Sequence, residues 1–263
     1  MLTDLFWRDG VQYNINNRGD YQEAVNRAFK DFSSRTLDKI VDNAKVDEIK
    51  RKEAQQYIVD RFYAYFNEEN VVDFETWHNE TCEEFLKRYN EAIKDNYKAV
   101  RYGKAQKIVN MMFKYLYCYS NAEHYEEKFQ NCHLTLDSYT LEWFQDKVVK
   151  KLNETRKKGK DYIKKMEGTW SNLEKGDKEC IWSYLWIQNE IKKYLNTCPH
   201  DNQDNPFKAE FSIWDDYRNM RLEKEFTKIF SSYVRKIKED DNTINDEQIL
   251  DKLKLLIANV VVD

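Results

Sequence analysis

The chain has 263 residues, of which 41% are hydrophobic and 15% aromatic, so it can bury a large core without disulfide bonds. It holds only six glycines and two prolines, which leaves little turn chemistry for β-hairpins or for a glycine-rich phosphate loop. The net charge of −4 gives no bulk reason to expect nucleic acid or an acidic membrane as partner, although it does not exclude a local basic face. These features predict an all-α fold with roughly eight to ten helices around one aromatic-rich core.

The cysteines and the N-terminal sequence indicate the compartment. Five scattered cysteines without CxxC pairs are typical of reduced thiols. The N-terminus lacks a basic region followed by an apolar stretch, and no window approaches eighteen apolar residues. We therefore expect a cytoplasmic protein without a membrane partner. We also expect no cofactor and no metal, because neither His78 with Cys82 nor Cys132 and His133 with Cys198 and His200 has a zinc-site spacing.

Apolar periodicity predicts most of the helices in the first half of the chain. One helix opens near Asp20, a second spans 47–66, and a third is capped by Asp73 and ends near Asn96. Gly103 marks the next boundary, after which residues 104–119 place an apolar stripe beside several lysines. A polar loop over 120–132 then leads to a helix that begins at Asp137 or Ser138.

The second half begins with a strongly basic stretch over 147–165, which either contacts phosphate or is simply solvated. Asp177 is expected to cap an aromatic helix that ends near Leu195, and both prolines fall in the loop over 196–206. Residues 206–214 alternate between apolar and polar and predict a short extended stretch, followed by helices over 214–237 and 249–257. We expect a single helical domain over 1–263, or two closely packed lobes, 1–102 and 103–263, with a cleft between them.

Two short segments suggest a chemistry. The first is YGKAQKIVN at 102–110, where a turn glycine precedes a helix with a lysine in its first turn. The second is LDSYTL at 136–141, an apolar residue followed by an aspartate, a small residue and an aromatic. Together they resemble the helix-hairpin-helix DNA glycosylases, in particular the branch that resembles 8-oxoguanine glycosylase. The resemblance covers about forty residues.

The resemblance implies a role for each matching residue. Gly103 would let helix-end amides hold a DNA phosphate. Lys104, with Lys107 as second choice, would be the amine that forms a Schiff base, and Asp137 would stabilise positive charge on the sugar. A flipped base would need an aromatic pocket, for which the candidates are Tyr139, Trp143, Trp182 and Trp186. Further phosphate contacts would come from Lys114, Lys147, Lys150 and Lys151.

The sequence departs from the family pattern at three points. The usual Gly-x-Gly hairpin is reduced to Gly103, Lys104 and Asp137 stand 33 residues apart, and Tyr139 replaces a common histidine. Each candidate also has a structural interpretation. Gly103 can end a helix, the lysines can be solvated, Asp137 can be only an N-cap, and the tryptophans can belong to the core.

Three functional hypotheses therefore stand side by side. The first is a DNA glycosylase-like protein that binds or acts on damaged or modified DNA. The second is a non-catalytic helical protein that binds a protein partner or a small ligand, for example in bacterial defence or stress. The third is an inactive glycosylase-like fold that is used for binding. The enzyme needs Asp137 and the amine of Lys104 or Lys107 in one accessible cleft, whereas the interaction protein needs a contiguous exposed apolar patch.

Overall fold

The computed structural model describes residues 12–36, 47–68, 73–93, 99–154, 156, 162–201, 203–240 and 248. In this part of the chain the all-α prediction is confirmed, because it forms helices and no β-strand beyond isolated bridge residues such as His200 and Gln203. None of the helices described here carries an apolar stretch long enough to cross a lipid bilayer. The helix expected over 249–257 lies outside the described residues, as does part of the basic stretch over 147–165.

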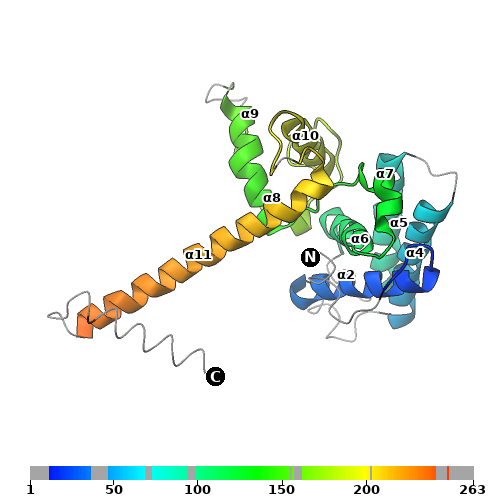
Figure 1. Cartoon of the computed structure of the whole chain (residues 1–263), viewed down its shortest axis with the longest axis horizontal. Helices are drawn as coiled ribbons and strands as arrows, with labels where there is room; N and C mark the ends of the chain where they lie inside the picture. The colour runs from blue at the N-terminus through cyan, green and yellow to red at the C-terminus, as the bar shows by residue number, and fades with distance from the viewer. Residues whose placement is uncertain are drawn as a thin grey trace. The chain divides into compact units, whose positions relative to one another are not determined.

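Four helices build the first half of the molecule: α2 (Tyr21–Thr36), α4 (Glu48–Asn67), α5 (Phe74–Ala92) and α6 (Tyr102–Tyr117). A short 3₁₀ turn, η1 (Arg18–Asp20), precedes α2. The carboxylates of Asp47 and Asp73 accept amide hydrogen bonds in the first turns of α4 and α5, which confirms the N-cap predicted at Asp73. Helix α4 packs against α5, and α6 packs against both α2 and α5 (Figure 1).

Aromatic side chains fill the space between these helices. Phe62 of α4 and Phe113 of α6 are fully buried, with ring centroids 4.7 Å apart, and Trp77 of α5 meets Phe62 edge-on at 5.0 Å. Each such side chain contributes roughly 1.5–3 kcal/mol by leaving water. The aromatic-rich core that the composition predicts therefore lies where α4, α5 and α6 meet.

Shorter elements follow α6. They are η2 (Ala122–Tyr125), α7 (Glu126–Phe129), α8 (Ser138–Trp143), the π-helical turn η3 (Phe144–Val149), α9 (Lys150–Glu154) and the 3₁₀ turn η4 (Trp170–Asn172). Helices α10 (Tyr184–Thr197) and α11 (Pro206–Asp240) come last. The turn η4 packs against α6, and α10 packs against η3. The loop from α7 to α8 and the loop around η4 thus both return to the helices of the core.

Three local predictions are wrong. Residues 120–132, expected as a polar loop, contain the short helical elements η2 and α7. The aromatic helix begins at Tyr184 with Ser183 as its N-cap, whereas Asp177 accepts amide hydrogen bonds from Glu179 and Cys180 in a separate turn. Residues 206–214 are not extended but form the start of α11. Their alternating pattern is misleading because Glu210, which reads as an outward polar residue, is only 1% exposed.

The compact units of the chain are residues 1–214 and 215–263. No boundary appears at the lobe limit expected near residue 102, because α5 and α6 pack together across it. All the candidate residues named from the sequence lie in the first unit, and the site can be described within it.

Candidate functional site: a lysine–aspartate pair between two indoles

The structure brings together Lys107 of α6 and Asp137, which stands immediately before α8. The Nζ atom of Lys107 lies 3.5 Å from Oδ2 of Asp137, and the two side chains are 17% and 12% exposed. Both groups therefore reach the surface, yet most of their hydration is replaced by protein. Of the two lysines considered as the amine, Lys107, the second choice, forms this pair.

The two carboxylate oxygens of Asp137 have different partners. Oδ1 accepts hydrogen bonds from the backbone amides of Tyr139 and Thr140, at 2.9 and 3.2 Å, which makes Asp137 the N-cap of α8. The Thr140 hydroxyl accepts the amide hydrogen bond of Asp137 and completes a capping box. Oδ2 accepts the indole N–H of Trp214 at 3.2 Å and faces Lys107. One oxygen is committed to the helix, and the other belongs to the site.

Two half-buried tryptophans frame the pair. The Lys107 amine lies 4.7 Å from the ring centroid of Trp170, a distance at which the ring face attracts a cation. On the carboxylate side, Trp214 meets the ring of Tyr139 edge-on at 5.4 Å. Sequence reasoning placed neither tryptophan beside Lys107, because nothing local connects η4 or the start of α11 with this lysine.

Gly103 explains how Trp170 reaches this position. A Cβ atom at residue 103 would lie 2.0 Å from the carbonyl oxygen of Trp170, so only glycine admits this close approach. The Gly103 amide donates to the carbonyl of Leu173 at 2.9 Å. This amide is thus already used inside the protein, and the structure assigns Gly103 to packing η4 against α6 rather than to holding phosphate.

The other predicted lysines divide into buried and exposed positions. Lys114 is 6% exposed and its Nζ lies 2.8 Å from Oε1 of Glu210, so this lysine is an interior partner and not a contact for DNA. Lys104 is half-buried in the first turn of α6 and stands one turn from Lys107. Lys147, Lys150 and Lys151 are exposed on η3 and α9, where Lys151 forms an ion pair with Glu154 at 2.9 Å.

The predicted aromatic pocket is not assembled as one cluster. Trp143 is fully buried beside Tyr194 and His200, as the core interpretation expects. Trp182 and Trp186 instead contact each other and the ring of Phe144. Among the four aromatic residues named from the sequence, Tyr139 alone contacts a residue of the lysine–aspartate site, namely Trp214.

No family model, curated protein or solved structure matches this chain. Any function assigned to it therefore rests on its own side chains. Among the described residues, no three histidine, cysteine or carboxylate side chains are grouped closely enough to hold a metal ion. His78 and Cys82, considered above as ligands, are both buried in the core, and His78 takes part in a polar network there.

This buried network fixes the backbone that leads to Asp137. The amide of Asn110 on α6 accepts a hydrogen bond from His78 at 2.9 Å and donates one to Gln106. Gln106 in turn donates to the carbonyl of Leu136 at 2.9 Å, directly before Asp137. Because these groups are closed off from water and bonded to one another, the network holds Leu136 and hence Asp137 in register with Lys107.

Proposed function

We propose that the chain binds damaged or abasic DNA and forms a covalent intermediate with it, with Lys107 as the amine and Asp137 as the carboxylate. The observation that carries the proposal is the 3.5 Å approach of Lys107 Nζ to Asp137 Oδ2 at a place where both remain partly exposed. The resemblance of residues 102–110 and 136–141 to DNA glycosylases supplies the substrate class.

The chemistry needs an amine that has lost its proton and a carboxylate near the sugar. Asp137 Oδ2 lies within reach of the Lys107 ammonium and can accept that proton. The neutral amine then attacks C1′, so that the nitrogen–C1′ bond forms as the bond to the base breaks. The electron pair leaves on the base nitrogen, which takes the proton that Asp137 has accepted, so the carboxylate is ionised again and stabilises positive charge that develops on the sugar. The C1′–O4′ bond then opens, O4′ takes a proton from the attached nitrogen, and an imine remains between Lys107 and C1′.

At an abasic site the same amine attacks the open aldehyde, and loss of water gives an imine. The exposed lysines of η3 and α9 supply positive charge for the flanking phosphates. Trp170 and Trp214 offer flat apolar surfaces beside the reacting atoms, on which a base or sugar can pack.

Borohydride trapping tests this proposal directly. Full-length protein is incubated with a duplex that carries one abasic site, and with one that carries 8-oxoguanine, in the presence of sodium borohydride. Hydride reduces the imine to a stable amine, so a covalent protein–DNA adduct is expected, and Lys107→Met should abolish it. Lys104→Met is the matched control, since it removes an amine one turn away on the same helix, and it should retain the adduct.

Two results would overturn the proposal. One is the absence of any adduct with wild-type protein on both duplexes. The other is an adduct that persists at the wild-type level in Lys107→Met, because the amine would then come from elsewhere. Thermal melting of each variant shows whether lost trapping reflects lost folding.

A second candidate function has an observation of its own, in the unit formed by residues 215–263. Within this unit α11 carries five large apolar side chains at helical spacing, all of them exposed: Leu222, Phe226, Ile229, Phe230 and Tyr233. A contiguous apolar stripe on a surface is typical of a helix that binds another helix. We infer as the alternative that this stripe mediates association between copies of the chain, since the same stripe on two copies can pair with itself.

Sedimentation velocity over a hundredfold range of protein concentration distinguishes this alternative. Phe226→Glu should shift the chain toward the monomer, whereas Thr227→Glu, which adds the same charge at the neighbouring exposed position, should not. A wild-type protein that remains monomeric throughout the range would rule out self-association. The trapping experiment would be unaffected by that result.

A further inference from the structure

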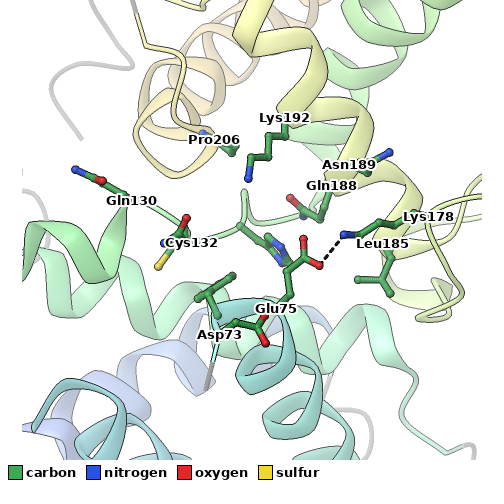
Figure 2. A pocket seen from close by; sticks show the side chains of 13 residues that line it. Asp73, Glu75, Gln130, Cys132, Lys178, Leu185, Gln188, Asn189, Lys192 and Pro206 are labelled. Atoms are coloured by element: carbon green, nitrogen blue, oxygen red, sulfur yellow. Dashed lines mark hydrogen bonds and ion pairs between the residues drawn. The ribbon is translucent and has the colours of Figure 1, made fainter. Parts of the chain in front are cut away.

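A cavity in the first unit is separate from the lysine–aspartate site. It has a volume of about 280 Å³ and is bounded by the start of α5, residues 130–133, Lys178, one side of α10 and Pro206. Figure 2 shows side chains from these segments converging on it. Neither Lys107 nor Asp137 lines it, so nothing in the proposed DNA chemistry uses it.

Gln188 of α10 provides the first sign that the cavity takes a ligand. Its Nε2 donates to the carbonyl of Leu134 at 2.7 Å, which fixes the orientation of the amide. Its Oε1 is buried, and the residue is only 5% exposed, yet this oxygen has no hydrogen-bond partner in the described structure. In Figure 2 the Gln188 oxygen faces the cavity. A buried acceptor without a partner is costly, and a ligand N–H or O–H in the cavity would satisfy it.

The charges around the cavity leave one cation uncommitted. Lys178 Nζ is paired with Glu75 Oε2 at 2.7 Å, and the Asp73 carboxylate caps α5. Lys192 of α10 forms no ion pair with any described residue, and its amine points into the cavity in Figure 2. The lining holds two carboxylates, Asp73 and Glu75, as well as two lysines, so it is the single amine of Lys192, and not the cavity as a whole, that can meet an anionic group on the ligand.

The remaining walls are flat and apolar or neutral. Phe74, Leu185 and Pro206 line one part of the cavity. His133 meets Phe74 edge-on at 5.0 Å, and its Nδ1 lies 2.9 Å from the Tyr184 hydroxyl. Burial of the imidazole lowers the pKa of His133 well below its usual range, so the ring is neutral at pH 7. These walls suit a planar ring.

We propose that this cavity binds a nucleoside monophosphate, with the base against Phe74, a base N–H donated to Gln188 Oε1 and the phosphate beside Lys192. The lining offers an apolar wall, a hydrogen-bond acceptor and a lysine amine. A mononucleotide carries the three matching groups, namely a planar ring, a hydrogen-bond donor and an anion. The volume favours one nucleotide over a dinucleotide cofactor, because cavities for larger ligands are commonly several hundred Å³. The inference does not rest on the proposed DNA chemistry.

Isothermal titration calorimetry on the full chain tests the inference, with the four ribonucleoside 5′-monophosphates as probes and guanosine as the ligand without phosphate. At least one monophosphate should give saturable one-to-one binding. Lys192→Met should weaken that binding about tenfold or more. Lys193→Met is the matched control, because Lys193 is exposed, does not line the cavity and is paired with Glu190, and it should leave the affinity within about twofold.

Gln188→Met separates the base contact from the phosphate contact. It removes the hydrogen-bond acceptor and should weaken the binding of guanosine and of the monophosphates alike. Lys192→Met should weaken the binding of the monophosphates only. The inference fails if none of the four monophosphates binds at millimolar concentration, or if Lys192→Met and Lys193→Met bind them equally well. Since Lys192 is exposed, its variant decides the question even if Gln188→Met does not fold.

Discussion

Helix α6 carries two lysines that look alike in the sequence, and in the structure they form different ion pairs with carboxylates from other segments. Lys107 and Lys114 are seven residues apart and so lie on the same face of the helix, two turns from each other. Lys114 meets Glu210 at 2.8 Å, with the side chains 7% and 1% exposed. Lys107 meets Asp137 at the longer distance of 3.5 Å, with 17% and 12% exposed.

The Lys114–Glu210 ion pair is part of the protein interior, whereas the Lys107–Asp137 pair can still be reached by a ligand from solvent. Glu210 is saturated, since its second oxygen accepts the Thr135 amide at 2.7 Å while the first accepts Lys114. Burial nevertheless raises the pKa of Glu210, with Lys114 opposing that shift. Both amines lie over an aromatic ring, Trp170 for Lys107 and Phe211 for Lys114, but the Lys107 amine has a longer contact with its carboxylate and an opening to solvent. Shared position on a helix therefore does not imply shared use.

The largest expected effect tests this difference through stability. Lys114→Met leaves the Glu210 charge buried without its partner and should lower the free energy of unfolding by about 3–5 kcal/mol. Lys107→Met, the same substitution two turns away, should lower it by about 1 kcal/mol or less, because its partner is partly hydrated. Urea denaturation at pH 7 measures both.

A double variant shows whether the buried charge is the cause. In Lys114→Met/Glu210→Gln the carboxylate is replaced by a neutral amide that can still accept the Thr135 amide, so more than half of the lost stability should return. Equal losses in the two single variants would break the distinction between the pairs. No recovery in the double variant would assign the loss to packing rather than to charge.

Much of the first half of the fold could be predicted from the sequence because the signals there are local. Asp47, Asp73 and Asp137 each precede an apolar helical pattern, and each caps a helix in the structure. The segment from residue 206 was mispredicted for a long-range reason. Glu210 counts as an outward polar residue in the sequence, whereas its actual partner, Lys114, is 96 residues away.

The site was predicted in part. The sequence named Lys107 and Asp137, and helical spacing limits the amine to a few lysines, but only the folded chain distinguishes Lys107 from Lys104. Trp170 and Trp214 were missed because they arrive from distant segments, Trp170 through an approach that the missing side chain of Gly103 allows. The sequence around Gly103 does not reveal by itself which segment packs against this glycine.

The next effect concerns Asn110, which lies between the two lysines on the same face of α6. Its side chain forms a hydrogen bond with His78, and neither partner is charged. Burial lowers the pKa of His78 from 6.5 to about 4, so the folded protein holds this imidazole neutral. Its contribution to stability is complete above pH 6.5 and is lost as the pH falls toward about 4. For His78 alone the loss amounts to about 3 kcal/mol.

Urea denaturation between pH 7.5 and 4 measures this loss. His78→Asn should flatten the pH dependence in that window relative to wild type, whereas the exposed His124→Asn should leave it unchanged. Glu210 acts in the opposite direction, because its raised pKa favours the folded state as the pH falls, but it is present in all three proteins and does not affect the comparison. An unchanged slope in His78→Asn would show that His78 is not the titrating group.

The smallest effect divides the two functions of Asp137 itself. Asn is as good an N-cap as Asp, so Asp137→Asn can keep the bonds of Oδ1 to the Tyr139 and Thr140 amides and should change stability by no more than about 0.5 kcal/mol. Asp137→Ala loses the cap and should cost about 1 kcal/mol. With its oxygen in the cap, the Asn variant places an NH₂ group opposite Lys107 and the Trp214 N–H, so it removes the carboxylate that accepts the amine proton. Borohydride trapping should therefore fall at least tenfold in Asp137→Asn although thermal melting hardly changes. Wild-type trapping in this variant would reduce Asp137 to a helix cap, and the open pair on α6 would then be as structural as the closed one.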